Sequence, residues 1–259
     1  MNEAEKFKLE KIKNIKSLGL DDDLRNKSIQ WIEHISKYKW AYNFSYLGRP
    51  AIQFPNDIWA MQELIWDIKP DLIIETGIAH GGSLIFSASM LAMLDICEAI
   101  ENQNTFDPSI SKRKVLGIDI DIRDHNRKEI EKHPMYTRIS MIEGSSIDKK
   151  IIKEVSKFAS NYNKVMVFLD SNHTHDHVLE ELVAYGELTS PGSYCVVFDT
   201  IIDDMPDKMF TDRPWDKKNN PKTAVLQYLK DNPQFEIDND IHNKLQITVA
   251  PSGFLKKME

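Results

Sequence analysis

Apolar runs and amphipathic stretches alternate along most of the chain. Continuous apolar runs are typical of parallel strands buried on both faces. Such runs predict strands at residues 71–77, 114–120, 139–143, 164–170 and 193–199. Between and after them, apolar residues at helical spacing predict helices at residues 82–97, 125–132, 148–158, 175–189 and 221–231. This alternation predicts an α/β fold in which right-handed crossovers join the strands of a parallel sheet.

The end of the chain departs from this alternation. Two closing strands are predicted near residues 235–241 and 245–255. Because no long helix separates them, we expect them to form an antiparallel hairpin. The complete sheet would then have seven strands, mostly parallel, with a reversed last strand.

The beginning of the chain also stands apart. Its pattern predicts amphipathic helices at residues 3–19 and 24–40, followed by an aromatic, irregular segment at residues 42–55. A further helix then leads into the first strand of the sheet. We therefore divide the chain into an N-terminal extension, residues 1–55, and a main domain, residues 56–259.

The composition narrows the class of protein. A chain of 259 residues can bury a full core, and its net charge of −7 argues against a nonspecific nucleic-acid binder. The two cysteines, Cys97 and Cys195, fall on a predicted helix and a predicted strand, so we expect buried free thiols in a reducing cytoplasm. We find neither a signal-peptide pattern nor a transmembrane span, and we expect a cytoplasmic protein.

The first predicted strand runs into a glycine loop and then a helix. This order opens nucleotide-binding α/β units, in which the ligand sits beyond the carboxyl ends of the strands. The loop matches neither common phosphate-binding motif, and the acid Glu75 at the strand tip suits a cationic ligand. S-adenosylmethionine carries an ammonium and a sulfonium, so it is the first candidate cofactor. Its predicted contacts here are Glu75, Gly77, His80, Gly81 and Ser83.

The next two strand tips supply further candidate cofactor contacts. Asp119 ends the second strand, where an acid can accept hydrogen bonds from both ribose hydroxyls. The third strand is followed by Gly144, Ser145 and Ser146, a small polar loop suited to an adenine edge. The alternative for Asp119 is a solvated acid at a strand end.

The fourth and fifth strands end in acids that predict a metal site. Asp170 and Asp199 follow adjacent parallel strands, whose tips lie about 5 Å apart. Two carboxylates beside a cofactor cleft can hold Mg²⁺, which would lower the pKa of a substrate hydroxyl. His173 lies three residues after Asp170 and is the candidate general base. We also count Asp170 among the catalytic and cofactor-binding candidates.

Other interpretations of this segment exist. Asp170 would be a simple helix cap, and His173 part of the polar first turn, if no metal binds. His173 and His177 are four residues apart and suit a zinc pair, although the surrounding sequence matches no zinc-hydrolase motif. His175 is expected to face solvent.

Candidate acceptor contacts come from two segments. The insertion after the fifth strand contains Asp203, Arg213 and Trp215, and the aromatic N-terminal segment contains Arg49 and Gln53. Aromatic and arginine side chains suit a sugar, or an anionic carrier such as a nucleotide diphosphate. The alternative for the insertion is a mobile polar loop with a packing tryptophan.

Several of these blocks resemble the family of cephalosporin hydroxylases and rhamnosyl O-methyltransferases. The resemblance covers residues 42–257 and is specific at residues 75–83, 169–178, 198–200, 220–225 and 243–251. It implies a Rossmann-like class I methyltransferase fold, with helices on both faces of the sheet, that uses S-adenosylmethionine and Mg²⁺. The metal ligands and histidine base of the family and its macrolide-sugar methyltransferase relatives map onto Asp170, Asp199 and His173.

One position departs from the family pattern. Some relatives carry Glu-Asp at the fifth strand tip, both binding metal, where this chain has Phe198 and then Asp199. The missing ligand would have to come from elsewhere, and Asn172 and Asp203 are the candidates.

These features together predict an O-methyltransferase that acts on a sugar hydroxyl, in the synthesis of a surface polysaccharide or a glycosylated metabolite. A non-sugar small molecule is the alternative acceptor. A catalytically silent subunit that binds only the cofactor is the competing non-enzyme interpretation. The N-terminal helices suit packing on their own domain or on a sister subunit, so a homo-oligomer is expected.

Overall fold

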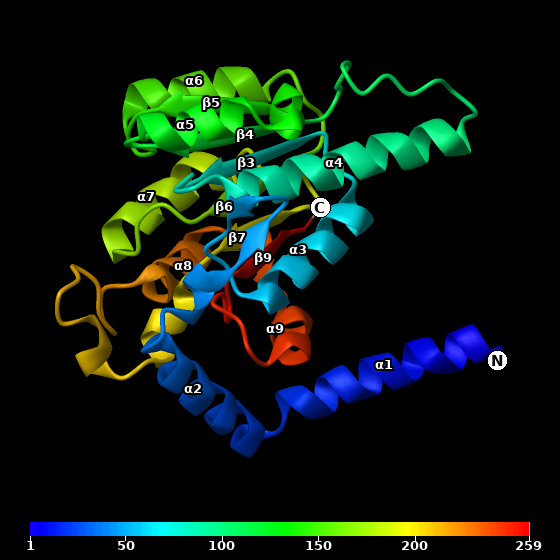
Figure 1. Cartoon of the computed structure of the whole chain (residues 1–259). Helices are drawn as coiled ribbons and strands as arrows, with labels where there is room; N and C mark the ends of the chain where they lie inside the picture. Colours follow the sequence, from blue (N-terminus) through cyan, green and yellow to red (C-terminus); the bar gives the residue numbers. More distant parts are fainter. Residues whose placement is uncertain (259) are drawn as a thin grey trace.

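The central element is one twisted sheet. The computed structural model describes residues 1–258, and within them seven strands pair in the order β5-β4-β3-β6-β7-β9-β8 (Figure 1). The strands are β3 (Leu72–Thr76), β4 (Lys114–Asp119), β5 (Ile139–Glu143), β6 (Val165–Leu169), β7 (Tyr194–Val197), β8 (Phe235–Ile237) and β9 (Phe254–Lys257). The first five pair in parallel, and β9 runs antiparallel to both of its neighbours. The predicted mostly parallel sheet with a reversed last strand is therefore confirmed.

Helices cover both faces of the sheet, as predicted. One face packs against α3 (Pro55–Ile68), α4 (Gly82–Glu101), α5 (Asp124–Glu131) and α9 (Asn239–Leu245). The other packs against α6 (Lys149–Ala159), α7 (His175–Gly186) and α8 (Pro221–Asp231). Side chains alternate along each strand, so on β3 Ile73 joins the first layer while Leu72 and Ile74 join the second.

Helix α4 is the most apolar long helix in the described part of the chain. By its 20 residues and a mean hydropathy of 1.7 it is the one helix there that could cross a bilayer. Its first half is instead packed on the sheet, with Leu84, Ile85, Ala88 and Leu91 fully buried. We therefore interpret α4 as a core helix of the domain.

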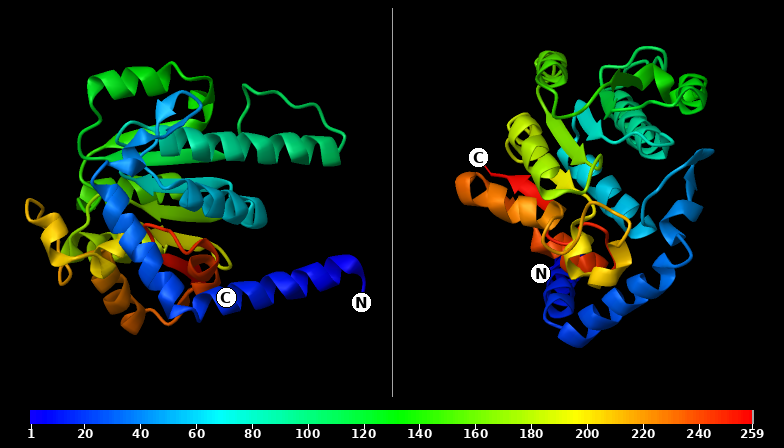
Figure 2. Two further views of the ribbon diagram at one scale, coloured as in Figure 1. Left: turned by 60° about the horizontal axis from the view of Figure 1, so that its bottom comes forward. Right: turned by 90° about the vertical axis from the view of Figure 1, so that its left-hand side faces the viewer.

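The N-terminal segment wraps around the edge of the domain (Figure 2). It contains α1 (Glu3–Gly19), α2 (Asp22–Ser36), η1 (Trp40–Asn43) and a two-stranded ribbon of β1 (Ser45–Tyr46) and β2 (Arg49–Pro50). Both predicted helices are present, although α2 ends four residues before the expected position because a left-handed turn at Lys39 precedes η1. The boundary between residues 55 and 56 stays a prediction.

The prediction for the closing strands was wrong in extent. β8 and β9 are short. A loop at residues 246–253 occupies most of the predicted second strand, and α9 begins within the predicted first strand. The Asp238 side chain accepts a hydrogen bond from the amide of Asp240 and so caps α9. Ile241 and Leu245, four residues apart, lie on the same face of α9 and pack on the core. Three short 3₁₀ turns complete the fold: η2 (Pro134–Arg138), η3 (Thr200–Asp204) and η4 (Asp207–Phe210).

A fully buried carboxylate holds the loop that replaces the predicted strand. Asp57, in the first turn of α3, accepts hydrogen bonds from the Thr248 hydroxyl and from the Val249 amide at 3.0 Å. Burial raises the pKa of Asp57 from its ordinary value of 3.8 to about 7, against the opposing effect of these two hydrogen bonds. The loop thus satisfies its backbone with a side chain rather than with a neighbouring strand.

This burial predicts a pH-dependent stability. Because the folded state keeps the proton of Asp57 to a higher pH than the unfolded state, the free energy of unfolding should fall as pH rises from 3.8 to about 7. Urea denaturation of Asp57→Asn should show a shallower slope across this range, by at most about 1.4 kcal/mol per pH unit. Asp148→Asn, at the exposed N-cap of α6, is the control and should keep the wild-type slope. Equal slopes for Asp57→Asn and wild type would contradict the prediction.

Candidate active site

The glycine loop after β3 passes very close to the tip of β6. Gly77 has a φ of 90°, and a Cβ placed on it would lie 2.1 Å from the carbonyl oxygen of Asp170. Gly81 has a φ of 81° and precedes α4, whose first turn has no side-chain cap. The loop therefore presents the uncapped amides of a helix start at the carboxyl edge of the sheet, where a carboxylate of a cofactor can bind.

Asp119 holds this loop from the tip of β4. Its Oδ2 atom accepts hydrogen bonds from the amides of Ile78, at 2.8 Å, and Ala79, at 3.2 Å. Its Oδ1 atom accepts one from Asp121, at 3.2 Å. Asp119 is therefore not a free solvated acid. Its carboxylate oxygens can still accept hydrogen bonds from further donors, such as those of a ligand.

The loop after β5 meets the start of α7 through a polar cluster. Ser146 is buried, and its hydroxyl lies 3.1 Å from Nε2 of His177. Ser171 lies 3.2 Å from the same nitrogen and donates a hydrogen bond to the buried Glu181 at 2.6 Å. His177 is therefore engaged by Ser146 and Ser171, and it does not form the zinc pair with His173 that the sequence left open.

Three predicted site residues come together at the tips of β6 and β7. One ligand atom from each of Asp170, His173 and Asp199 lies within 4.8 Å of the other two. Nδ1 of His173 is 3.7 Å from Oδ2 of Asp199. Asp199 begins η3 with a left-handed φ of 55°, which turns the chain just as it leaves the sheet. The geometry suits a divalent cation with open positions for water or substrate oxygens.

The charges at these tips also favour a bound cation. The pKa of Asp170 is raised well above its ordinary 3.8, first by burial and then by the neighbouring carboxylates of Asp199 and Glu75. Burial raises the pKa of Glu75 from 4.5 to about 7, opposed by a hydrogen bond from Ser83. Oε2 of Glu75 is buried without a hydrogen-bond partner in the described residues. A metal ion and a cationic cofactor would both stabilise this crowded negative charge.

Neither proposed substitute for the missing metal ligand joins the cluster. Phe198 is buried with its ring edge-on to Phe168, so it offers no oxygen. Oδ1 of Asn172 accepts hydrogen bonds from the amide and hydroxyl of Thr174, both at 2.9 Å.

Asp203 is engaged elsewhere as well. It accepts a hydrogen bond from Asn220 at 3.2 Å and lies 3.5 Å from the ammonium of Lys222. It therefore ties η3 to the start of α8, and the described residues bring two carboxylates and one imidazole to the cluster.

His175, which was expected to face solvent, is half-buried and contacts a neighbouring helix. Nδ1 of His175 lies 2.8 Å from the Thr223 hydroxyl, and Nε2 lies 3.1 Å from Oε1 of Gln227. Both partners belong to α8, which packs along α7. The sequence could not show this contact because it depends on which helix neighbours α7.

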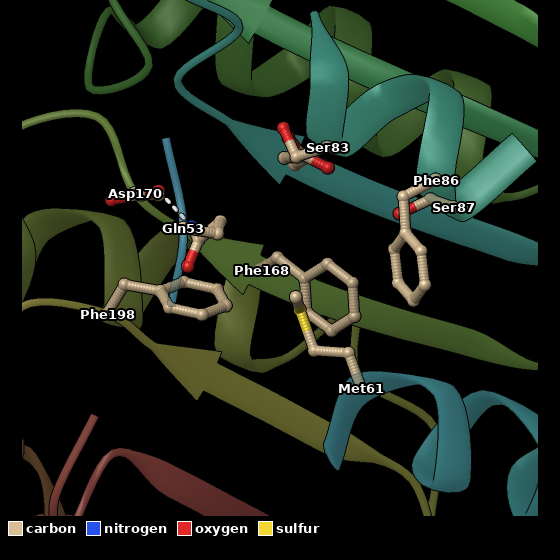
Figure 3. A pocket seen from close by; sticks show the side chains of 9 residues that line it. Gln53, Met61, Ser83, Phe86, Ser87, Phe168, Asp170 and Phe198 are labelled. Carbon is tan, nitrogen blue, oxygen red and sulfur yellow. Dashed lines mark hydrogen bonds between the residues drawn. The ribbon is translucent and has the colours of Figure 1, made fainter. Parts of the chain in front are cut away.

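Arg49 and Gln53, the N-terminal residues predicted to contact the methyl acceptor, instead bond to residues of the protein at the site. Arg49 donates hydrogen bonds to the carbonyl oxygen of His80, at 3.0 and 2.7 Å, and to Asn126 at 3.1 Å. Gln53 donates a hydrogen bond from Nε2 to Oδ2 of Asp170 at 2.8 Å (Figure 3). Arg49 thus fastens the N-terminal segment to the glycine loop, and Gln53 reaches the metal cluster.

Gln53 also lines a small cavity behind the cluster. The cavity holds about 10 Å³, enough for one water, and is lined by Gln53, Met61, Glu75, Ser83, Phe86, Ser87, Phe168, Asp170 and Phe198 (Figure 3). Among the described residues, Oε1 of Gln53 and the hydroxyl of Ser87 have no hydrogen-bond partner. The sequence predicted Gln53 only as a contact to the methyl-accepting substrate. Its contact with Asp170, 117 positions away, leaves no signal along the chain.

The insertion after β7 brings Trp215 against the cluster. The Trp215 ring stands edge-on to the His173 imidazole, with ring centroids 4.7 Å apart. The Arg213 guanidinium lies 5.4 Å from the centroid of the Trp215 ring. Trp215 therefore adjoins the candidate base, and Arg213 lies over the Trp215 ring.

Known proteins are similar to this chain in sequence and in fold. The rhamnosyl O-methyltransferase of Mycobacterium bovis is 27% identical over 230 residues, covering 84% of this chain and 82% of the relative. The rhamnosyl O-methyltransferase of Mycobacterium leprae is 27% identical over 227 residues, covering 84% and 87%. CmcI, solved with Mg and S-adenosylmethionine, has the same fold, with a TM-score of 0.54, 16% identity and coverage of 84% of this chain and 78% of that one. The sequence pattern of one family, rhamnosyl O-methyltransferase/CmcI, matches residues 38–258, and the chain belongs to that family.

Proposed function

We propose that the protein transfers the methyl group of S-adenosylmethionine to a hydroxyl of a sugar, with the help of Mg²⁺. The observation that carries this proposal is the cluster of Asp170, His173 and Asp199 beside the glycine loop. Membership of the family supports it, as do the rhamnosyl O-methyltransferases that are similar over most of their length. CmcI, whose fold is shared, binds both Mg and S-adenosylmethionine.

The cofactor would lie across three strand tips. Glu75 and the uncapped start of α4 suit the ammonium and carboxylate of its amino-acid end. Asp119 suits the ribose, because its carboxylate is fixed by the loop amides that it accepts. The loop at residues 144–146 suits the adenine.

The chain's own residues would carry the rest of the reaction. When bound, S-adenosylmethionine supplies an electrophilic methyl group, and Mg²⁺ makes a sugar hydroxyl more acidic. Asp170 and Asp199 would hold the ion next to the acceptor. His173 would take the proton from the hydroxyl, and Asp199, 3.7 Å from Nδ1, would stabilise the imidazole once it is charged.

The acceptor would enter beneath the insertion that carries Arg213 and Trp215. An indole ring at the edge of His173 gives an apolar wall for a sugar face, and the guanidinium above it suits an anionic carrier. A surface polysaccharide or glycosylated metabolite fits this site. We place the enzyme in the cytoplasm, because Cys97 and the buried Cys195 are free thiols, and we propose a homo-oligomer.

One observation favours a second candidate. Phe198 is buried in the core where some relatives have a metal-binding glutamate, which suits a catalytically silent subunit that binds only the cofactor. The assembled cluster of Asp170, His173 and Asp199 favours the enzyme. A methyl-transfer assay with labelled S-adenosylmethionine, a panel of free and nucleotide-linked sugars, and non-sugar alcohols separates these candidates.

The first prediction concerns the cofactor. Asp119→Ala should weaken binding of S-adenosylhomocysteine about tenfold to a hundredfold, because a charge-assisted hydrogen bond to the ribose is lost. Titration calorimetry measures this change. Asp119→Asn keeps an oxygen for the loop amides and should lose less. Wild-type affinity in Asp119→Ala would mean that the tip of β4 does not touch the cofactor.

The second prediction concerns the metal. Excess EDTA should abolish methyl transfer, while the protein should stay folded and melt in one cooperative transition, because the sheet has its own apolar core on both faces. Added Mg²⁺ should restore the rate. Full activity in EDTA would remove the metal from the mechanism and leave Asp199 as a direct contact to the acceptor.

The third prediction concerns the base. His173→Ala should lower kcat by about 10²–10⁴, toward the lower end because the ion also acidifies the hydroxyl. Cofactor affinity should stay near wild type.

His175→Ala is the matched control for this variant. It removes two contacts of the same helix to α8, so it reports any loss that comes from a loosened α7. Equal and small losses in both variants would assign proton removal to a carboxylate or to solvent.

A further inference from the structure

The segment that carries Gln53 is built onto the glycine loop. We call residues 44–53 the N-terminal strap. A Cβ placed on Gly82 would lie 2.3 Å from the carbonyl oxygen of Pro50 and 2.6 Å from Cα of Ala51, so the strap backbone rests directly on the first turn of α4. Arg49 bonds the carbonyl oxygen of His80. The strap is therefore held against the site before Gln53 is reached.

A second anchor fixes the strap along α4. The Tyr46 hydroxyl lies 3.0 Å from that of Ser89, and the Tyr46 ring stands edge-on to Phe86 with centroids 5.2 Å apart. The Ala51 amide donates a hydrogen bond to the carbonyl oxygen of Phe44 at 3.0 Å, which closes the strap on itself. These contacts anchor the strap as far as Ala51, two residues before Gln53.

Gln53 itself is buried, with 6% of its surface exposed. Its amide nitrogen faces Asp170 and donates to Oδ2, which is the arrangement that suits the ionised carboxylate of a metal ligand, since that group can only accept hydrogen bonds. The bond of 2.8 Å to Oδ2 restrains the Asp170 carboxylate, one of whose oxygens lies within 4.8 Å of ligand atoms of His173 and Asp199.

The oxygen of the same amide does not compete with this contact. Oε1 of Gln53 has no hydrogen-bond partner in the described residues, so the link to Asp170 is the only polar contact of this side chain there. A buried amide with a single polar contact, on a strap anchored independently of it, is placed to act through that contact.

We propose that Gln53 is a positioning residue that orients Asp170 for the divalent cation. The inference rests on the proposed function, and it deepens it by adding the N-terminal strap to the parts that build the metal site. Loss of an outer partner of a metal ligand commonly lowers metal affinity about 10–100-fold. Gln53 should therefore control affinity for the ion and leave binding of the cofactor nearly unchanged.

The test compares metal and cofactor binding in the full-length protein. Free Mn²⁺ is measured by electron paramagnetic resonance, and S-adenosylhomocysteine binding in EDTA is measured by calorimetry. Gln53→Leu should weaken Mn²⁺ binding about 10–100-fold and raise the Mg²⁺ concentration for half-maximal activity by a similar factor. Affinity for S-adenosylhomocysteine should stay within about twofold of wild type, the ordinary scatter of context-dependent effects.

Two further variants make the outcome decisive. Ser87→Ala removes another buried polar group that lines the same cavity without contacting Asp170, and it should bind Mn²⁺ as wild type does. Gln53→Met, flexible and similar in length, replaces Gln53→Leu if the latter does not fold. Wild-type Mn²⁺ affinity in the folded Gln53 variant would overturn the inference and leave the proposed function intact. An absence of Mn²⁺ binding in the wild-type protein would overturn both.

Discussion

Parallel strands bring their carboxyl ends to one edge, and in this protein four of those ends deliver acids to it. Glu75, Asp119, Asp170 and Asp199 all belong to neighbouring strand tips. Burial raises the pKa of Glu75, and burial together with the nearby carboxylates of Asp199 and Glu75 raises that of Asp170. Such an edge is stable only when donors and cations surround it. Much of the local structure serves that need: loop amides bond Asp119, an amide bonds Asp170 and an imidazole adjoins Asp199.

The same constraint explains how activity and stability are joined in this fold. Burial of carboxylates without full compensation costs free energy, and the apolar layers on both faces of the sheet must offset it. A bound ion and a cationic cofactor would relieve part of that cost. The site is then completed by its ligands, in the way that preorganised active sites commonly trade stability for function.

The sequence predicted the sheet and its tips because both depend on local patterns. Apolar runs gave the strands, and the rule that parallel tips share an edge brought Asp170 and Asp199 together with His173. It failed where the outcome depended on distant partners. Residues 245–255 have strand-like composition, yet Asp57, far away in the chain, holds part of that stretch as a loop. The contacts of Gln53 and His175 were missed for the same reason, since each joins segments that no periodicity connects.

The backbone at Asp199 limits which residues can replace it. Its φ of 55° lies in the left-handed region, where asparagine and glycine are tolerated and most other residues cost about 1–2 kcal/mol. Replacing Asp199 by alanine would therefore combine the loss of a carboxylate with the cost of an unfavourable backbone conformation. Asparagine would remove the charge alone. Natural variation here is expected to favour aspartate, asparagine and glycine for reasons of backbone geometry, whether or not a sequence still binds a metal.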